Sequence, residues 1–217
     1  RSLLISGFNS IQRNDREIYS KVFTDEQRNN LTTNDISFNL VPKINATGRL
    51  ANANLGVKMF LENEVDSILA QIENINETRK DVTQESLLKI IDEATIKNEK
   101  YNCIVVYKEG LHEGVVGILA SRLVEAFNKP AFVLTDSHGM AKGSARSLGT
   151  INVYDLLTKQ NHLLVKFGGH AGAAGLSLKV ENINELQELM HQDLVENFTE
   201  EDYVNKIEYF EINKLNE

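Results

Sequence analysis

The sequence contains no tryptophan, two prolines and a single cysteine in 217 residues. One cysteine excludes a disulfide framework within the chain and argues against a zinc site built from cysteines. Cys103 lies in the apolar run YNCIVVY, so we expect it to be a small core residue.

Long hydrophobic runs are also missing. No stretch approaches the roughly 18 uninterrupted apolar residues that a membrane helix needs. Arg1 opens directly into sequence of globular character, without a basic and apolar leader. We therefore expect a cytoplasmic chain with no membrane partner, and its length and 41% hydrophobic content suit one large domain or two small ones.

The net charge of −8 argues at first against nucleic acid, because phosphate binders usually carry a basic surface. The acidic excess, however, lies in residues 176–217, where 11 acidic residues stand against three basic ones. Residues 101–175 are slightly basic, with seven basic and five acidic residues. We interpret the acidic end as a solvated helix face, with a regulatory tail as the alternative.

Residues 1–63 mix short elements with loops. The sequence predicts a helix over 15–27, a turn-rich stretch over 31–50 around Pro42, and a second helix over 51–63.

Residues 64–98 contain neither glycine nor proline, and their apolar residues recur at spacings of three and four. This pattern predicts one long amphipathic helix, or two helices with a break near Thr78. Helices of this length often connect domains.

From residue 101 the pattern alternates between strand and helix. Apolar runs at 103–107 and 130–135 flank a helical segment at 113–127, which indicates a βαβ unit. Further elements are expected as a strand at 139–147, a helix at 152–160, a strand at 174–180, a helix at 182–198 capped by Asn182 or Asn184, and a strand-like segment at 205–213.

The segment GGHAGAAGL, residues 168–176, is unusual in its small side chains. Four glycines and three alanines surround one histidine, His170. Such residues allow a close approach of the backbone, and successive N–H groups in a turn can bind an anion that the imidazole also contacts. The alternative is a tight turn before a packed strand.

The segment KGSARS places Ser144 and Arg146 two residues apart, so both side chains point to the same face of a strand. A hydroxyl and a guanidinium on one face suit a phosphate, since each charge-assisted hydrogen bond contributes about 1.5–3 kcal/mol. The alternative is a solvated arginine on an edge strand.

These segments carry a resemblance to a known family. The order LHEGVVGILASRLVEAFNKPAFVL, GSARS and FGGHAGAAG resembles the DHH-associated domain type 1 of the DHH phosphoesterases. Upstream, PKINATGRL resembles the segment that closes the DHH domain. The similar parts span roughly residues 35–198. Together with the long helix, they resemble most the branch of 5′-to-3′ exonucleases specific for single-stranded DNA.

The resemblance implies an α/β fold: a small mixed β-sheet flanked by helices, preceded by a long connecting helix and the end of a DHH domain. It implies the boundaries 1–63 for the end of the DHH domain, 64–98 for the connecting helix, 99–200 for the DHH-associated domain and 201–217 for the start of a further region. In the family the glycine–histidine motif lines the cleft that holds the substrate phosphate.

Carried over by motif, the implied nucleic-acid-binding residues are a loop at Gly168, Gly169 and His170, with Ser144 and Arg146 beside it on the neighbouring strand, and Asn45 and Arg49 where the DNA strand could pass.

The catalytic half of the family uses two divalent cations, Mn²⁺ or Mg²⁺, held by an Asp-His-His motif, which this sequence lacks. Its histidines stand singly at 112, 138, 162, 170 and 191. His112 and Glu113 are interpreted as the opening of a helix, with substrate contact as the alternative, and His138, His162 and His191 as surface residues. We expect no catalytic residue and no cofactor in this chain. We interpret it as the part of such an exonuclease that binds substrate without cleaving it.

Three functions stay open at this point. The first is the substrate-gripping module of a DNA exonuclease, with single-stranded DNA as partner. The second is the same domain in an oligoribonuclease or cyclic-dinucleotide phosphodiesterase. The third is a docking domain whose acidic helix binds a helicase or a single-strand-binding protein. Phe167, Tyr107 and Tyr154 are candidates for base stacking, but their apolar surroundings favour core packing.

Overall fold

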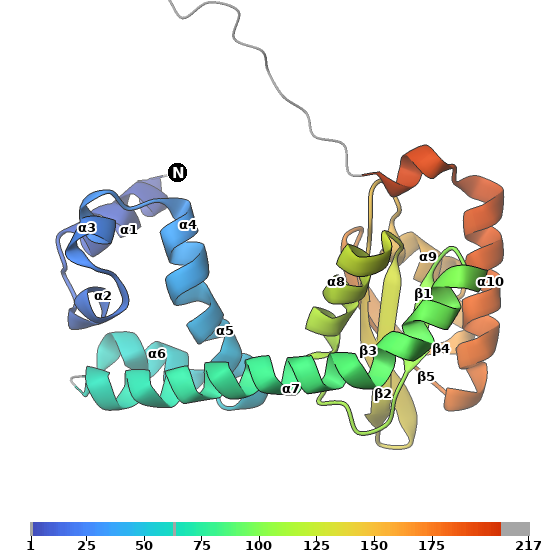
Figure 1. The fold of residues 1–217 in the computed structure, drawn as a ribbon, viewed down its shortest axis with the longest axis horizontal. Helices are drawn as coiled ribbons and strands as arrows, with labels where there is room; N and C mark the ends of the chain where they lie inside the picture. The colour runs from blue at the N-terminus through green and yellow to red at the C-terminus, as the bar shows by residue number, and fades with distance from the viewer. Residues whose placement is uncertain (1, 63, 205–217) are drawn as a thin grey trace, which may run out of the picture. The chain divides into compact units, whose positions relative to one another are not determined.

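The computed structural model describes residues 2–62 and 64–204. The chain divides into two compact units, residues 1–84 and residues 85–217, and the boundary lies within helix α7 (Val65–Lys100). Unit 1 is helical, and unit 2 is built on a β-sheet (Figure 1). The finer partition at 63, 98 and 200 stays a prediction. No helix of the described residues is long and apolar enough to cross a membrane.

Unit 1 consists of short helices and the first part of α7. They are α1 (Ser2–Gln12), α2 (Glu17–Val22), α3 (Asp25–Asn29), α4 (Thr33–Asp35), the π-helix η1 (Ile36–Leu40), α5 (Val41–Leu50) and α6 (Asn54–Leu61). Their apolar side chains pack with those of α7 into one buried core, which includes Ile18, Phe23, Met59 and Ile72.

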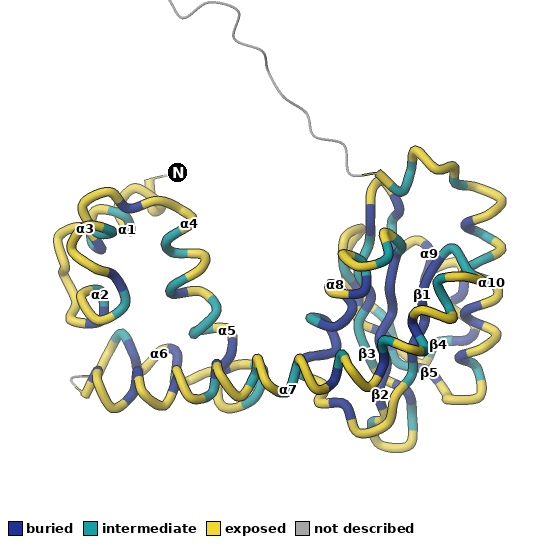
Figure 2. The backbone as a smooth tube through the Cα atoms, viewed as in Figure 1, coloured by how far each residue is buried: buried dark blue, intermediate teal, exposed yellow. Residues whose placement is uncertain are grey.

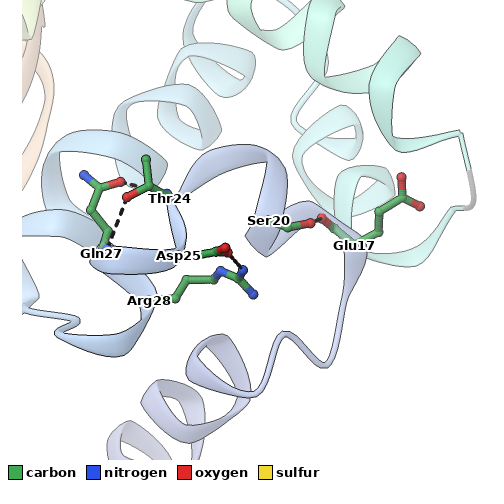
Figure 3. Close-up of polar contacts among 6 residues, drawn as sticks. All are labelled: Glu17, Ser20, Thr24, Asp25, Gln27 and Arg28. Atoms are coloured by element: carbon green, nitrogen blue, oxygen red, sulfur yellow. Dashed lines mark hydrogen bonds and ion pairs between the residues drawn. The ribbon is translucent and has the colours of Figure 1, made fainter.

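The prediction of one helix over 15–27 is wrong, because two helices occupy this range. Phe23 is extended and buried, and Thr24 starts a new helix. The Thr24 hydroxyl accepts a hydrogen bond from the Gln27 N–H at 3.2 Å, and the Gln27 side chain accepts one from the Thr24 N–H at 3.0 Å (Figure 3). This capping box satisfies two N–H groups at a helix start and so favours the break. In the same turn, Arg28 pairs with Asp25.

The turn-rich interpretation of 31–50 is also wrong, because α4, η1 and α5 make this stretch helical. Thr32 and Asp35 form a second capping box at its start. Pro42 is the second residue of α5, in the first turn, where proline is common because its backbone angle φ suits a helix. The helix over 51–63 is confirmed as α6.

α7 is one continuous helix, so the prediction of a single long helix is confirmed and the alternative of two helices is wrong. At the suspected break, the Thr78 hydroxyl donates to the Asn74 carbonyl at 2.9 Å, one turn back, so the threonine is accommodated within the helix.

Within the described residues, unit 2 contains five strands in the spatial order β1-β2-β3-β5-β4. They are β1 (Ile104–Tyr107), β2 (Ala131–Ser137), β3 (Met140–Arg146), β4 (Leu164–His170) and β5 (Ala173–Leu178). β1 and β2 pair in parallel across the predicted βαβ connection, and the other pairs are antiparallel. The predicted α/β class with a small mixed sheet is confirmed.

Helices cover the two faces of this sheet unequally. The helices are α8 (Val116–Phe127), α9 (Val153–Lys159) and α10 (Ile183–Asn197), with 3₁₀ turns η2 (Asn161–Leu163), η3 (Val180–Asn182) and η4 (Glu200–Tyr203). α8 packs on β2 and β3 from one side, whereas α9 and α10 cover the other side and bury the main core (Figure 1). Most residues of β1 and β2 are buried, whereas no residue of β4 is (Figure 2).

Two details of unit 2 differ from expectation. The sequence did not predict β4, because glycines at its end suggested a loop. Asn182 is the N-cap of α10, but its side chain makes no capping bond and instead donates to the Leu163 carbonyl at 3.1 Å. The expected strand at 205–213 lies outside the described residues.

Candidate nucleic-acid interface

The sheet face on which α8 packs over β2 and β3 continues onto β5 and β4. β5 pairs with β3 on one side and with β4 on the other, so residues in register form rows across the three strands. Nine residues share the face on which α8 packs, and we call them the open face: Arg146, Ala173 and His170 in the first row, Ser144, Gly175 and Gly168 in the second, and Lys142, Ser177 and Lys166 in the third.

The register brings the predicted residues of unit 2 together and corrects their arrangement. Ser144 and Arg146 share one face of β3, as their spacing predicts. The strand beside them is β5, not the strand of the glycine–histidine motif, so two strand spacings, about 10 Å, separate Arg146 from His170. Ala173 of β5 lies between Arg146 and His170 in this row.

Arg146 is held at the first turn of α8. Its Nη1 donates to Ser144 Oγ at 2.6 Å and to the Ala145 carbonyl at 2.7 Å. Gly117 of α8 lies directly over this pair, because a Cβ at Gly117 would come within 2.8 Å of Arg146 Nη2 and 3.3 Å of Ser144 Oγ. The absence of a side chain at Gly117 therefore lets the guanidinium lie between helix and sheet.

His170 ends β4 at the exposed edge of the sheet. Its Nδ1 accepts a hydrogen bond from the Gly172 N–H at 3.2 Å. This bond assigns the proton of the neutral imidazole to Nε2, which leaves Nε2–H as a donor for a ligand oxygen.

The predicted loop at Gly168, Gly169 and His170 is wrong, because these residues continue β4 and only Ala171 and Gly172 turn the chain. Gly169 has φ of 153°, and a Cβ there would lie 2.3 Å from the Ala173 carbonyl oxygen. Only glycine fits such a close approach of two strands. Because residues 168–170 pair with β5 as a strand, they do not form the anion-binding turn foreseen for them.

Gly168 and Gly175 leave the middle of the open face bare. A Cβ at Gly168 would meet no atom within 4 Å, and one at Gly175 would meet only a carbonyl oxygen at 3.8 Å. Sequence reasoning missed Gly175, Ala173 and Gly117 as parts of this site. The strand at 174–180 was predicted, but its position between β3 and β4 depends on a long-range pairing that no local signal indicates.

Asn45 and Arg49 lie in α5, which belongs to unit 1. Their spacing of four residues places both on one side of that helix, with Asn45 exposed and Arg49 half-buried. Their role along the path of a DNA strand stays a prediction.

The other histidines take several roles. His112 precedes α8, and its Nδ1 accepts from the Gly114 N–H at 3.0 Å, in agreement with a helix opening. His191 is not simply a surface residue: its Nδ1 accepts from the Asn102 N–H at 3.1 Å, and its ring meets Tyr101 edge-on. His138 adopts a left-handed backbone at φ of 49°.

The described residues do not fit the two divalent cations of the family. Within 2–62 and 64–204, no three histidine, cysteine, aspartate or glutamate side chains are grouped so that they could hold a metal ion. No hydrolytic step is therefore assigned to these residues.

The remaining expectations concern core packing. Cys103 is fully buried, and burial raises the pKa of its thiol to about 12. Phe167 and Tyr107 pack against the core, as predicted. The same prediction is wrong for Tyr154, whose side chain is exposed on α9 and contacts the Phe167 ring at 5.6 Å between centroids.

Residues 100–196 match the family model described as the DHHA1 domain. This part of the chain is a DHHA1 domain. It contains the whole open face, so the implied relationship with DHH phosphoesterases is confirmed for the segment that carries the predicted phosphate site.

Curated relatives extend the likeness beyond the DHHA1 domain. The single-stranded-DNA-specific exonuclease RecJ of Bacillus subtilis is 36% identical over 178 residues, which cover 78% of this chain and 22% of that protein. RecJ of Haemophilus influenzae is 33% identical over 183 residues, covering 78% and 32%. The chain thus spans less than a third of the length of these relatives and is similar to one region of RecJ.

Solved structures show the same fold. RecJ from Thermus thermophilus in complex with Mg²⁺ matches with a TM-score of 0.77 and 24% identity, over 93% of this chain and 31% of that one. An exonuclease RecJ bound to manganese matches with a TM-score of 0.73 and 25% identity, over 94% and 51%. The fold of the DHHA1 domain and the helices before it is therefore that of RecJ.

Proposed function

We propose that the open face binds the phosphate backbone of single-stranded DNA and holds it for a RecJ-like exonuclease that cleaves from 5′ to 3′. The observation that carries the proposal is the convergence of a guanidinium, a hydroxyl and an imidazole around a surface without bulky side chains. Arg146 and His170 stand at the two ends of the first row, and Gly168 and Gly175 keep the second row open.

The chemistry of these groups is that of phosphate binding. Arg146 Nη1 and Ser144 Oγ are already joined at 2.6 Å, so the guanidinium is pre-oriented for a planar pair of oxygens. His170 supplies a further N–H from the opposite edge. These side chains bind and orient the strand; the activated water would be supplied by the Mn²⁺ or Mg²⁺ that a DHH domain would hold. Asn45 and Arg49 of α5 are proposed as further nucleic-acid-binding residues.

The names of the relatives support single-stranded DNA as the substrate. We also propose that the protein acts in DNA repair or recombination in the cytoplasm, beside a helicase or a single-strand-binding protein. An enzyme for very short substrates is the second candidate, and it differs in requiring only a pocket for two to four nucleotides.

The test is fluorescence anisotropy of the 217-residue chain with a labelled 20-nucleotide single strand at low salt, with Mn²⁺ present and the products run on a gel. We expect binding without cleavage, weakened by Arg146→Gln and by His170→Ala. Arg122→Gln is the matched control, because Arg122 lies on the solvent side of α8 in an exposed pair with Glu125 at 3.1 Å. Equal affinity in the wild type, Arg146→Gln and His170→Ala would refute the proposed function.

A further inference from the structure

The third row of the open face holds two lysines around a hollow. Lys142 on β3, Ser177 on β5 and Lys166 on β4 lie in register. The hollow between them has a volume of about 330 Å³, and Gly168 and Gly175 of the second row also line it. A concave surface with two cationic side chains at its sides and a serine hydroxyl between them is a site where an anion can approach the sheet.

The two lysines differ in their pairing. Lys142 Nζ contacts the Glu113 carboxylate at 2.6 Å, and both side chains are about half exposed. Lys166 Nζ makes no ion pair or hydrogen bond with residues 2–62 or 64–204. One cation is thus available to a ligand at once, and the other becomes available when a ligand anion replaces an exposed carboxylate, an exchange that costs little in water.

The loop that carries Glu113 is fixed to the sheet. The Leu111 N–H donates to Thr135 Oγ1 at 3.1 Å, and the Gly110 N–H donates to the Asp136 carboxylate at 2.6 Å. Glu113 is therefore positioned at the end of the open face by the same strand, β2, that supports it.

The distance between the first and third rows determines which ligands can contact both rows. From His170 to Lys166 the strand runs four residues, about 13 Å at 3.3 Å per residue. A single phosphate bound at Arg146 does not reach the lysines. A chain of phosphates does, and over Gly168 and Gly175 of the second row it meets no side chain.

We propose that Lys142 and Lys166 form a second phosphate subsite, so that a bound single strand runs along β3, β5 and β4 from the arginine–histidine row to the lysine row. This inference rests on the proposed function and narrows it. The ligand of the open face is an oligonucleotide longer than a dinucleotide, and Glu113 weakens its binding by competing for Lys142.

The experiment compares two probes on the full chain: 5′-phosphorylated dT2 and 5′-phosphorylated dT6, each labelled at the 3′ end. We expect Lys166→Gln to weaken dT6 binding about fivefold and to lower the slope of log affinity against log salt by about one, because one phosphate contact is lost. Binding of dT2 stays unchanged. Glu113→Gln tightens dT6 binding about threefold, since it releases Lys142. Lys159→Gln is the control, because Lys159 pairs with Asp193 on the other side of the sheet.

The outcomes separate the two proposals. If Arg146→Gln weakens both probes while Lys166→Gln changes neither dT6 affinity nor its salt slope, the second subsite is refuted and the proposed function stands. If Lys166→Gln weakens dT2 and dT6 binding equally, Lys166 attracts any anionic ligand irrespective of its length. The second subsite is then also refuted. If Arg146→Gln changes neither probe, the proposed function fails and the second subsite fails with it.

Discussion

Gly168 and Gly169 are neighbours in β4, yet an added side chain meets different surroundings at each. At Gly168 it enters open space over the second row, whereas at Gly169 it meets the backbone of β5 at 2.3 Å. We expect Gly168→Val to fold with little change in melting temperature and to lose oligonucleotide binding. Gly169→Ala is expected to lower the free energy of unfolding by about 1–3 kcal/mol, because the strands must separate. Thermal unfolding and anisotropy of both variants check this.

The two variants are expected to lose different properties: Gly168→Val loses binding, and Gly169→Ala loses stability. Full binding by a folded Gly168→Val variant would show that the bare second row is not the path of the ligand. Val165→Leu on the same strand is the control, because Val165 is already exposed and lies outside the open face.

Cys103 gives the stability of unit 2 a pH dependence. Burial raises the pKa of its thiol from 9.0 to about 12. Between these values the unfolded thiol loses its proton while the native thiol keeps it, so the stabilisation is complete below pH 9 and is lost as pH rises toward 12. The free energy of unfolding should fall by about 1.4 kcal/mol per pH unit from this group.

The matched variant is Cys103→Ala, measured by urea unfolding at several pH values between 9 and 12. Tyr203, whose pKa burial also raises to about 12, contributes to the slope of both proteins. Only the difference between them reports the thiol, and identical slopes would contradict its assignment as a buried, protonated group.

Residue-level reasoning from the sequence predicted that Ser144 and Arg146 share a strand face, but it did not predict how far they lie from His170. The spacing of Ser144 and Arg146 placed them correctly on one face, because strand alternation is local. That β5 separates them from His170 follows from pairing between distant segments, which local patterns do not encode.

At the scale of elements, the contact between α8 and β3 couples the helix to the site through Gly117. Gly117→Ala adds a methyl group 2.8 Å from Arg146 Nη2, at the flexible end of that side chain. Because alanine favours a helix over glycine by about 1 kcal/mol, we expect equal or higher stability. The displaced guanidinium is expected to weaken single-strand binding several-fold.

Weaker binding together with equal or higher stability of Gly117→Ala would distinguish this effect from general damage to the fold, which lowers both. Ser121→Ala, one turn further along α8, removes only a hydroxyl that donates to the Gly117 carbonyl at 3.1 Å and should leave binding unchanged. Undiminished affinity in Gly117→Ala would mean that the position of Arg146 at the helix start does not matter for the ligand.

Elements with strong periodicity were predictable and those with mixed signals were not. α7, α8 and α10 follow from their apolar spacing. The stretch 31–50 was misjudged because Pro42 and several polar residues suggest turns, although proline is compatible with the first turn of a helix. β4 was missed because glycine is rare in strands, and here pairing with β5 outweighs that preference.

At the scale of the whole molecule, the charge of −8 opposes binding of a polyanion, but its location limits the effect. α10 packs against the core face of the sheet, opposite the open face, and its exposed carboxylates include Glu185 and Glu196. One helix layer and the sheet, about 10 Å each, separate these charges from the bound strand. The Debye length is about 8 Å at 0.15 M salt and about 30 Å at 0.01 M, so the repulsion reaches the open face only at low salt.

The double variant Glu185→Gln, Glu196→Gln is therefore expected to bind a 20-nucleotide single strand two- to threefold more tightly than the wild type in about 10 mM salt, and equally in about 150 mM salt. Anisotropy titrations at the two salt concentrations measure this. Removing α10 altogether is no substitute, because Leu186, Met190 and Leu194 belong to the buried core. Tighter binding at both salt concentrations would place the strand beside α10, and the open face would then not be the main route of the nucleic acid.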